Sequence, residues 1–303
     1  MKKTFYSNGK LLLTAEYLVL DGAEALALPT KFGQNLIVEE GANNIIYWKS
    51  FDADGSIWFQ NNIPFQDIID NKKEENDPEK NTLIEILHYG YLQNPNFIKN
   101  SIGYTITTQL TFPKKWGLGT SSTLINNIAQ WLEIDAFVLL RNSFGGSGYD
   151  IACAQNNTPI LFHLENEKPI SKSINFHPNF IDKLYFVYLN KKQNSKSAIA
   201  TYFKKRNNIE AMIPFIDGIT KSIIKAESLE EFSNLLNQHE AILSNILTLP
   251  TIKASLFPEF YGTIKSLGAW GGDFVLVVAE DDPTHYFEEK GYKTILSYNE
   301  MIL

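Results

Sequence analysis

The spacing of apolar and polar positions predicts a strand-rich first third of the chain. Short apolar runs bounded by Gly, Asp or Asn are typical of strands, and they occur at residues 5–6, 11–13, 25–28, 35–39, 45–48 and 57–59. Asp54-Gly55 between the last two runs indicates a hairpin turn. Residues 101–112 alternate between apolar and polar side chains, which predicts one more strand.

Two helices are predicted in the same half of the chain. Asp77-Pro78 ends a polar loop and provides an N-cap followed by Pro at the first helical position, so a helix is expected to run to about Gln93. A second helix follows a glycine-rich turn. The predicted inward-facing residues of the two helices are Leu83, Ile84, Leu87 and Tyr91, and Leu124, Ile125, Ile128, Trp131 and Leu132.

The second half of the chain has a different pattern. Residues 184–189 and 274–279 are predicted buried strands, and helical segments dominate between residues 198 and 247. Ser228 and Glu231 have the spacing of a capping box. Strands with interleaved helices in both halves favour an α+β fold. We expect two domains, residues 1–180 and 181–303, divided by a polar, irregular stretch at residues 169–178.

Composition and charge exclude several classes of protein. The chain has 303 residues, of which 44% are apolar, so it can bury a large core without disulfides or metals. The net charge of −7 argues against non-specific binding to nucleic acid or to an anionic membrane. A single cysteine, Cys153, excludes an internal disulfide and a cysteine-based zinc site.

The chain carries no predicted membrane span or signal peptide. The start faintly resembles a signal peptide, but Asn8, Lys10 and Glu16 interrupt any apolar segment. We therefore expect a cytoplasmic protein.

The most informative segment lies between a predicted strand and a predicted helix and reads Pro-Lys-Lys-Trp-Gly-Leu-Gly-Thr-Ser-Ser, residues 113–122. Its glycines allow backbone N–H groups to turn toward an anion, and the helix start adds unpaired N–H groups and a positive dipole end. Thr120, Ser121 and Ser122 add hydroxyls that can bind phosphate oxygens or a metal. It is not a Walker P-loop, because no Gly-Lys-Ser/Thr follows. The structural alternative is a glycine turn with a helix cap.

Three further segments combine glycine with groups that can do chemistry. Gly145-Gly146-Ser147-Gly148-Tyr149-Asp150 surrounds one acid with glycines, and that acid can accept a proton from a hydroxyl. Lys265-Ser266-Leu267-Gly268-Ala269-Trp270-Gly271-Gly272-Asp273 opens a strand. Ser7-Asn8-Gly9-Lys10, followed by Glu16-Tyr17, offers a lysine that can reach a phosphate as a point charge. Taken singly, each segment also fits a helix cap, a tight connection or a surface lysine.

A basic, hydroxyl-rich run follows the predicted strand at residues 184–189. Lys192, Ser195 and Ser197 in this run can hold an anionic substrate, and the alternative is a solvated loop. The five histidines show no metal-ligand spacing, and His239-Glu240 lacks the second histidine of a zinc protease helix.

In this order, the four segments resemble the motifs of the GHMP kinase superfamily of small-molecule kinases. Residues 117–122 resemble its Gly-Leu-Gly-Ser-Ser-Ala phosphate loop, and residues 147–150 resemble the loop that carries its acidic catalytic residue. Residues 7–27 and 268–273 resemble its N-terminal and C-terminal motifs. Residues 148–152, Gly-Tyr-Asp-Ile-Ala, also resemble the signature of a bacterial subgroup known as the GYDIA family.

The resemblance implies a fold, cofactors and roles for individual residues. The fold would combine an N-terminal domain like ribosomal protein S5 domain 2 with a ferredoxin-like C-terminal domain. The cofactors would be ATP and Mg²⁺, with Asp150 and Lys10 catalytic, residues 117–122 at the ATP phosphates and Ser121 at the metal. The implied substrate-binding residues are Glu16, Tyr17, Ser147, Gly148, Lys192, Ser195, Ser197, Gly268, Ala269, Gly271, Gly272 and Asp273. The partners would be ATP and a small anionic metabolite, with the protein a monomer or homodimer.

Motif details resemble phosphomevalonate kinases more than mevalonate kinases. Glu16-Tyr17, Gly-Ser-Gly-Tyr-Asp at residues 146–150 and Asp273 after the glycines carry this likeness. The expected reaction is therefore phosphorylation of mevalonate 5-phosphate or of mevalonate. The alternatives are an enzyme like diphosphomevalonate decarboxylase and a non-catalytic nucleotide-binding homologue.

The sequence departs from the superfamily pattern at three places. Ala15 and Trp270 stand where glycines are expected. Between Ser122 and Asp150 only Glu133 and Asp135 are acidic, and neither is in clear register to complete a Mg²⁺ site.

Overall fold

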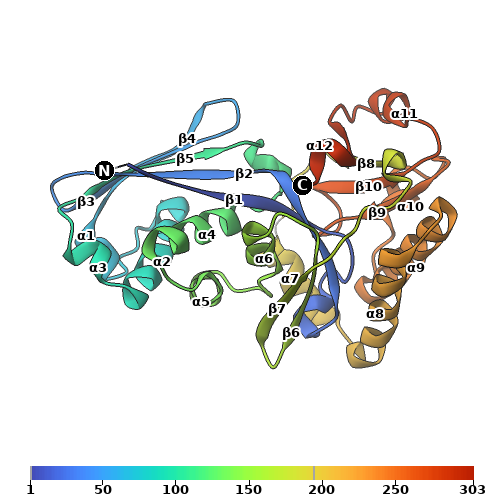
Figure 1. The fold of residues 1–303 in the computed structure, drawn as a ribbon, viewed down its shortest axis with the longest axis horizontal. Helices are drawn as coiled ribbons and strands as arrows, with labels where there is room; N and C mark the ends of the chain where they lie inside the picture. The colour runs from blue at the N-terminus through green and yellow to red at the C-terminus, as the bar shows by residue number, and fades with distance from the viewer. Residues whose placement is uncertain (1, 194) are drawn as a thin grey trace. The chain divides into compact units, whose positions relative to one another are not determined.

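The structure is a computed structural model that describes residues 2–193 and 195–303. It has an α+β fold, as the sequence predicts, and its residues pack into two compact units (Figure 1). The first unit contains the chain up to Gly9 with Phe32–Lys114 and Leu118–Gln155. The second contains Lys10–Lys31, Lys115–Gly117 and Asn156–Leu303. The division into domains at about residue 180 stays a prediction.

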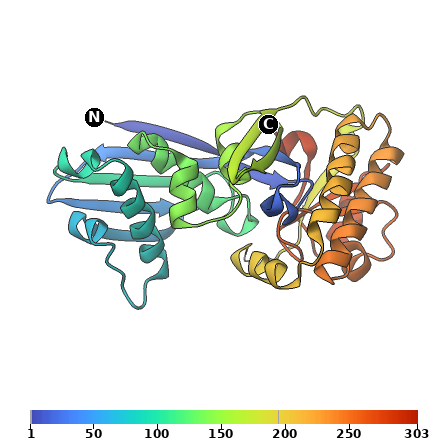
Figure 2. The same cartoon turned by 90° about the horizontal axis from the view of Figure 1, so that it is seen from below.

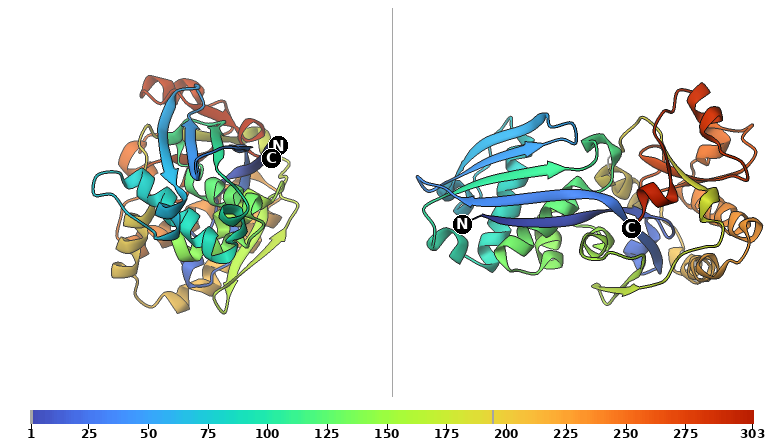
Figure 3. Two further views of the ribbon diagram at one scale, coloured as in Figure 1. Left: turned by 90° about the vertical axis from the view of Figure 1, so that its left-hand side faces the viewer. Right: turned by 45° about the horizontal axis from the view of Figure 1, so that its top comes forward.

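The first unit is a sheet covered on one face by helices (Figure 1; Figure 3, right). Its strands are β4 (Ile57–Pro64), β3 (Ile45–Phe51), β5 (Tyr104–Leu110) and the later part of β2 (Ala25–Glu40), in that order, with β1 (Lys3–Leu12) also paired to β2. The β3–β5 pair is parallel, whereas β3–β4 and β2–β5 are antiparallel. The helices are α1 (Phe65–Ile69), α2 (Pro78–Gln93), α3 (Asn96–Lys99), α4 (Thr120–Leu132), α5 (Ala136–Ser143) and α6 (Tyr149–Gln155).

The apolar faces of α2 and α4 form the core of this unit with the sheet. Trp48, Ile84 and Ile128 are among its fully buried members. The inward faces predicted for the two helices are confirmed, with Leu124 and Tyr91 packed at the margin. The N-cap of α2 is also confirmed, since the Asp77 carboxylate accepts the Lys80 N–H at 2.9 Å.

The second unit contains a four-stranded antiparallel sheet and two long helices that run side by side (Figure 2). The strand order is β11 (Ile295–Ser297), β8 (Leu184–Tyr188), β10 (Phe274–Val278) and β9 (Thr263–Ser266). The helices are α7 (Ser195–Lys205), α8 (Ile209–Lys225), α9 (Leu229–Leu247), α10 (Ile252–Leu256), α11 (Thr284–Glu289) and α12 (Tyr298–Met301). The early part of β2 pairs with β6 (Ile160–Glu165), which pairs with β7 (Lys168–Ser173).

Strand breaks predicted at Gly9 and between residues 28 and 35 are wrong, because β1 and β2 run through them. A Cβ on Gly33 would lie 2.2 Å from the Ser7 carbonyl oxygen, so this glycine permits close approach of two strands and does not end one. Pro29 lies between the stretches of β2 that pair with β6 and β5, where its missing N–H costs no ladder bond of either pair.

The capping predicted for the helix at residue 228 is confirmed in part. The Ser228 hydroxyl accepts the Glu231 N–H at 3.2 Å, but the Glu231 carboxylate accepts from Glu227 N–H instead of from Ser228. Among the residues described, no helix is both long and apolar enough to cross a membrane.

Candidate active site

The start of α4 has the backbone geometry of an anion site. Gly119 is its N-cap, with φ 97°, and as a glycine it has no side chain to cap the first turn. Gly117 also has a left-handed φ of 74°. Four N–H groups at a helix start lack intrahelical partners, and the helix dipole is positive there. This thirteen-residue helix therefore offers an open N-terminus to a phosphate.

The three hydroxyls of this segment have different surroundings. The Ser122 hydroxyl donates to the Gly119 carbonyl oxygen at 2.9 Å, which keeps it within the turn. The Thr120 hydroxyl is buried and has no hydrogen-bond partner. Ser121 is partly exposed. Ser121 thus remains the hydroxyl proposed for the metal, and Thr120 offers an unused oxygen at the same turn.

A buried polar network fixes α4 within the first unit. Asn127 accepts from the Ser7 hydroxyl at 2.8 Å and donates to the Gln34 carbonyl oxygen at 2.9 Å. Asn126 donates to Ser7 and accepts from Gln155 at 2.9 Å. Because Gln155 ends α6, the helix that carries Asp150 is tied to the helix that opens at the phosphate loop.

Asp150 is the second residue of α6 and is partly buried. Its Oδ1 accepts the N–H of Ile151 at 3.2 Å, the local bond of a helix start. Ser147 and Gly148 ahead of it are buried, and Gly148 has φ 93°. A Cβ on Gly148 would lie 3.0 Å from the Phe137 ring, so the loop packs closely at a position that favours glycine.

Lys10 lies against the other end of the phosphate loop, in the second unit. Its Nζ donates to the Gly117 carbonyl oxygen at 3.2 Å. The Asp273 carboxylate packs on Gly117 so closely that a Cβ there would lie 2.3 Å from Asp273 Cγ. Burial raises the pKa of Asp273, an effect opposed by the Gln193 N–H at 3.0 Å and by the charges of Lys10 and Lys192. A lysine, a buried carboxylate and a loop glycine therefore meet at one place.

The loop at residues 268–273 needs its glycines. Gly268 and Gly271 have φ of 66° and 94°, and a Cβ on Gly272 would lie 2.4 Å from the Lys191 carbonyl oxygen. Asp273 N–H donates to that same carbonyl at 2.7 Å. The loop is thereby packed against residues 191–193, which belong to the basic run predicted to hold an anionic substrate.

The turn at residues 15–17 is strained. Ala15 has φ 61°, and Tyr17 has φ 66° and ψ −45° with the Leu18 N–H bonded to the Glu16 carbonyl oxygen at 2.8 Å. That arrangement is a γ-turn of the rare, strained kind. The Tyr17 hydroxyl accepts the Trp270 N–H at 3.0 Å, and its ring stacks on Tyr202 at 5.4 Å. The turn and the 268–273 loop therefore touch.

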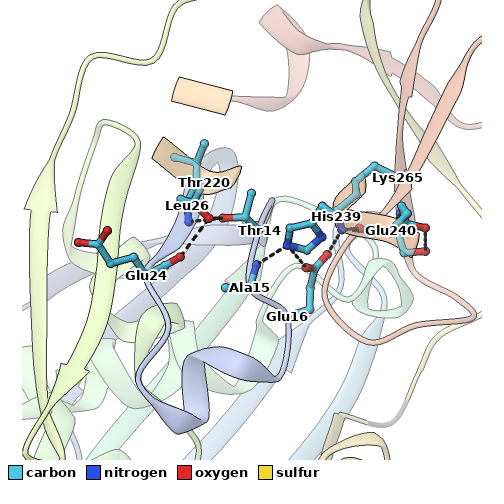
Figure 4. A network of polar contacts seen from close by, with 10 residues as sticks. Thr14, Ala15, Glu16, Glu24, Leu26, Thr220, His239, Glu240 and Lys265 are labelled. Atoms are coloured by element: carbon cyan, nitrogen blue, oxygen red, sulfur yellow. Dashed lines mark hydrogen bonds and ion pairs between the residues drawn. The ribbon is translucent and has the colours of Figure 1, made fainter. Parts of the chain in front are cut away.

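Glu16 is buried and not open to solvent. It is 1% exposed and its carboxylate pairs with Lys265 (Figure 4). Burial raises the pKa of Glu16 to about 7, against the opposing charge of Lys265. Its role in substrate binding stays a prediction, and its visible role is to anchor the turn.

The remaining predicted residues lie at the start of α7 and just before it. Lys192 and Ser197 are exposed, and the side chain of Ser195 lies outside the part of the chain that the structure describes. Further along α7, the Tyr202 hydroxyl donates to Asp21 at 2.5 Å. Through Tyr202, α7 is fixed to the turn that carries Tyr17.

The two acids between Ser122 and Asp150 lie away from the phosphate end of α4. Glu133 is its C-cap, and Asp135 caps α5 by accepting the Phe137 and Val138 N–H groups at 2.8 and 3.1 Å. Within the described ranges, no group of three or more His, Cys, Asp or Glu side chains could hold a metal. Mg²⁺ that is bound chiefly through phosphates and water, with one carboxylate such as Asp150, fits this donor set.

Lys265, His239 and Glu240 surround Glu16 and were not predicted as site residues (Figure 4). The Lys265–Glu16 pair spans 249 residues of sequence, so no local spacing reveals it. The one local signal was the charge of Lys265, three residues before the glycine-rich loop that starts at Gly268.

No family model matches the chain, and no curated protein matches it in sequence. Solved structures do match over nearly the whole chain. Mevalonate kinase of Methanococcus jannaschii is 16% identical, with a TM-score of 0.69 over 97% of this chain and 96% of that one. Phosphomevalonate kinase of Streptococcus pneumoniae, solved with phosphomevalonate and AMPPNP, is 14% identical, with a TM-score of 0.69 over 95% of each chain. Galactokinase of Lactococcus lactis, solved with galactose, is 12% identical, with a TM-score of 0.66 over 97% and 92%.

These likenesses show a shared fold. The chain has the fold of the GHMP kinases, as its motifs imply. Three kinases with different acceptors match about equally well, so the fold does not select one acceptor.

Proposed function

We propose that this protein is an ATP-dependent small-molecule kinase of the GHMP type. The observation that carries the proposal is the open start of α4 behind Gly117 and Gly119, with Lys10 bonded to the Gly117 carbonyl oxygen. Motifs at residues 117–122, 147–150 and 268–273 lie in a chain with that kinase fold. The motif details favour mevalonate 5-phosphate as acceptor, with mevalonate as the second candidate.

Each residue has a defined role in the proposed mechanism. Phosphoryl transfer depends mainly on positioning and on stabilising charge. The N–H groups at the start of α4 bind the phosphates of ATP, and Lys10 stabilises charge on the transferring group. Asp150 accepts or orients the proton of the acceptor hydroxyl. Ser121 and Asp150 would hold Mg²⁺ together with the phosphates, and the bound ion would supply positive charge that offsets the charge of the phosphates.

The acceptor is proposed to bind beside the 268–273 loop. Lys10 and Lys192 both act on the Asp273 carboxylate, so two cations face one acid there. The excess of positive charge favours an acceptor with an anionic end. Lys192, Ser195 and Ser197 at the start of α7 are proposed to hold this end.

An assay of ADP release with Mg-ATP tests the proposal, with mevalonate 5-phosphate and mevalonate as acceptors. Loss of a general base costs about 10²–10⁴ in rate, so Asp150→Asn is expected to lower turnover at least ~100-fold while ATP still binds. Lys10→Met is expected to lower turnover without unfolding the protein. Equal rates for wild type and Asp150→Asn would remove Asp150 from the mechanism.

The product pattern separates the alternatives. Release of CO₂ together with ADP and phosphate would indicate a decarboxylase. ATP binding without turnover on a broad panel of acceptors would indicate a non-catalytic nucleotide-binding protein.

A further inference from the structure

Two consecutive residues of α9, His239 and Glu240, are buried polar side chains that the proposed mechanism does not use. They are 0% and 3% exposed. Figure 4 shows His239 directed at the turn that carries Ala15 and Glu16, with Glu240 on the side of Lys265. His239 contacts the turn at residues 15–17, and Glu240 contacts Ser266, which leads into the loop at residues 268–273.

His239 holds the strained turn. Its Nε2 accepts the Ala15 N–H at 2.8 Å, so that nitrogen carries no proton. Burial and the charge of Lys265 keep the pKa of His239 well below its ordinary value, which agrees with a neutral ring. Ala15 has a left-handed φ and leads into the γ-turn at Tyr17. The bond therefore holds the backbone at a left-handed residue next to the γ-turn.

Glu240 holds the root of the glycine-rich loop. It accepts the N–H of Ser266 at 3.1 Å and its hydroxyl at 3.2 Å, and it pairs with Lys265 at 3.2 Å. Lys265 also pairs with Glu16 and donates to the Ser266 carbonyl oxygen at 2.6 Å. Ser266 ends β9, two residues before Gly268.

The two segments held by α9 meet at their tips. The Tyr17 hydroxyl accepts the Trp270 N–H at 3.0 Å, which connects the turn directly to the loop. His239 and Glu240 connect the same two segments a second time, through α9. We propose that His239 and Glu240 are positioning residues that hold residues 15–17 and 268–273 in the mutual geometry required to bind the acceptor. This inference rests on the proposed kinase function.

Stability alone is a poor explanation for this cluster. One lysine faces two buried carboxylates, and Glu16 Oε2 and His239 Nδ1 have no hydrogen-bond partner. Buried ion pairs are often no more stabilising than apolar side chains of the same volume, and unpaired buried polar atoms cost free energy. The cluster instead orients residues 15–17 and 268–273 relative to each other, and this role offsets the cost in stability.

Kinetics of His239→Leu, His239→Gln and the exposed-site control Gln238→Leu test the proposal. Small misplacements far from the chemistry can cost about 10²-fold, so His239→Leu is expected to lower kcat/KM for the acceptor by up to ~100-fold. ATP affinity is expected to stay unchanged. His239→Gln keeps an oxygen that can accept the Ala15 N–H and should recover most of the loss. Equal losses for acceptor and ATP, or no rescue by Gln, would overturn the positioning role.

Hydrogen exchange needs no substrate. It can therefore test the positioning role of His239 and Glu240 even if the kinase proposal fails. In His239→Leu, amide protection should fall in peptides that cover residues 13–18 and 266–273, while β10 and α8 keep theirs. A uniform fall across the second unit would mean a merely structural role, and no change in either segment would also refute the proposal. Glu240→Gln should reproduce the effect mainly at residues 266–273.

Discussion

Two residues of the turn at residues 15–17 have strained backbone conformations. Ala15 and Tyr17 both have left-handed φ, which L-residues avoid because Cβ crowds the following carbonyl. Strained residues persist only where surroundings over-determine them. Here the His239 bond to Ala15 and the bond of Tyr17 to Trp270 do so. The strained turn is therefore held in one conformation, as a turn that positions side chains at a binding site must be.

Ala15→Gly tests whether the strain at Ala15 is real. A left-handed φ costs a non-glycine residue about 1–2 kcal/mol, and the extra freedom of glycine in the unfolded chain costs about 0.5–1 kcal/mol. The variant is expected to be more stable by about 0–1.5 kcal/mol, measured by urea unfolding. Ala27→Gly, at a fully buried alanine of β2 without left-handed φ, should be less stable. A loss in both variants would contradict the strain.

The residue scale also shows what the sequence can reveal. Gly117, Gly268 and Gly271 were predicted as site residues. Each has a left-handed φ, a conformation that favours glycine, so their positions could be recognised from the residue type. The family resemblance implied that Glu16 binds the substrate. Its burial depends on Lys265, which is distant in sequence and near only after folding.

At the scale of elements, hydrophobic periodicity predicted the long helices and the strands β1–β5, β8 and β10, but it missed the continuity of β1 and β2 and shorter elements such as α1, α5, β6 and β7. The gap expected between the strands at residues 25–28 and 35–39 contains Gly33, which allows close packing on Ser7 within one continuous strand. On α4, the predicted apolar face is buried, but Asn126 and Asn127 are buried as well. Their partners Ser7 and Gln34 come from distant strands, so a pattern local to the helix could not reveal them.

Gly117→Ala tests the loop that opens α4. The φ of 74° makes any side chain unfavourable, and the new Cβ would collide with the Asp273 carboxylate. Gly55→Ala is the matched control, because Gly55 has φ 81° with nothing within 4 Å of a Cβ. The control should lose about 1–2 kcal/mol from backbone strain. Gly117→Ala should lose more and should bind ATP more weakly, as urea unfolding and calorimetry would show. Equal losses would mean that Asp273 does not pack on Gly117.

At the scale of the whole molecule, the cluster around Lys265 links stability to pH. Burial raises the pKa of Glu16 to about 7 and raises that of Glu240, while the pKa of His239 is lowered. A raised carboxyl pKa gives stability that is lost as pH rises, here toward 7 for Glu16. A lowered histidine pKa gives stability that is present above the unfolded value and lost as pH falls. The two contributions therefore have opposite slopes.

Comparison of wild type with His239→Gln isolates the histidine contribution. Below the ordinary histidine pKa of 6.5, the unfolded chain takes up a proton that buried His239 refuses. The free energy of unfolding of wild type should then fall, relative to the variant, by up to about 1.4 kcal/mol per pH unit. Because both proteins keep Glu16 and Glu240, the opposite slope of the carboxyls is present in both. Urea unfolding from pH 7.5 to 5.5 measures the difference. A constant difference across that range would mean that His239 takes up a proton in the fold as readily as in the unfolded chain, which is incompatible with its bond to the Ala15 N–H.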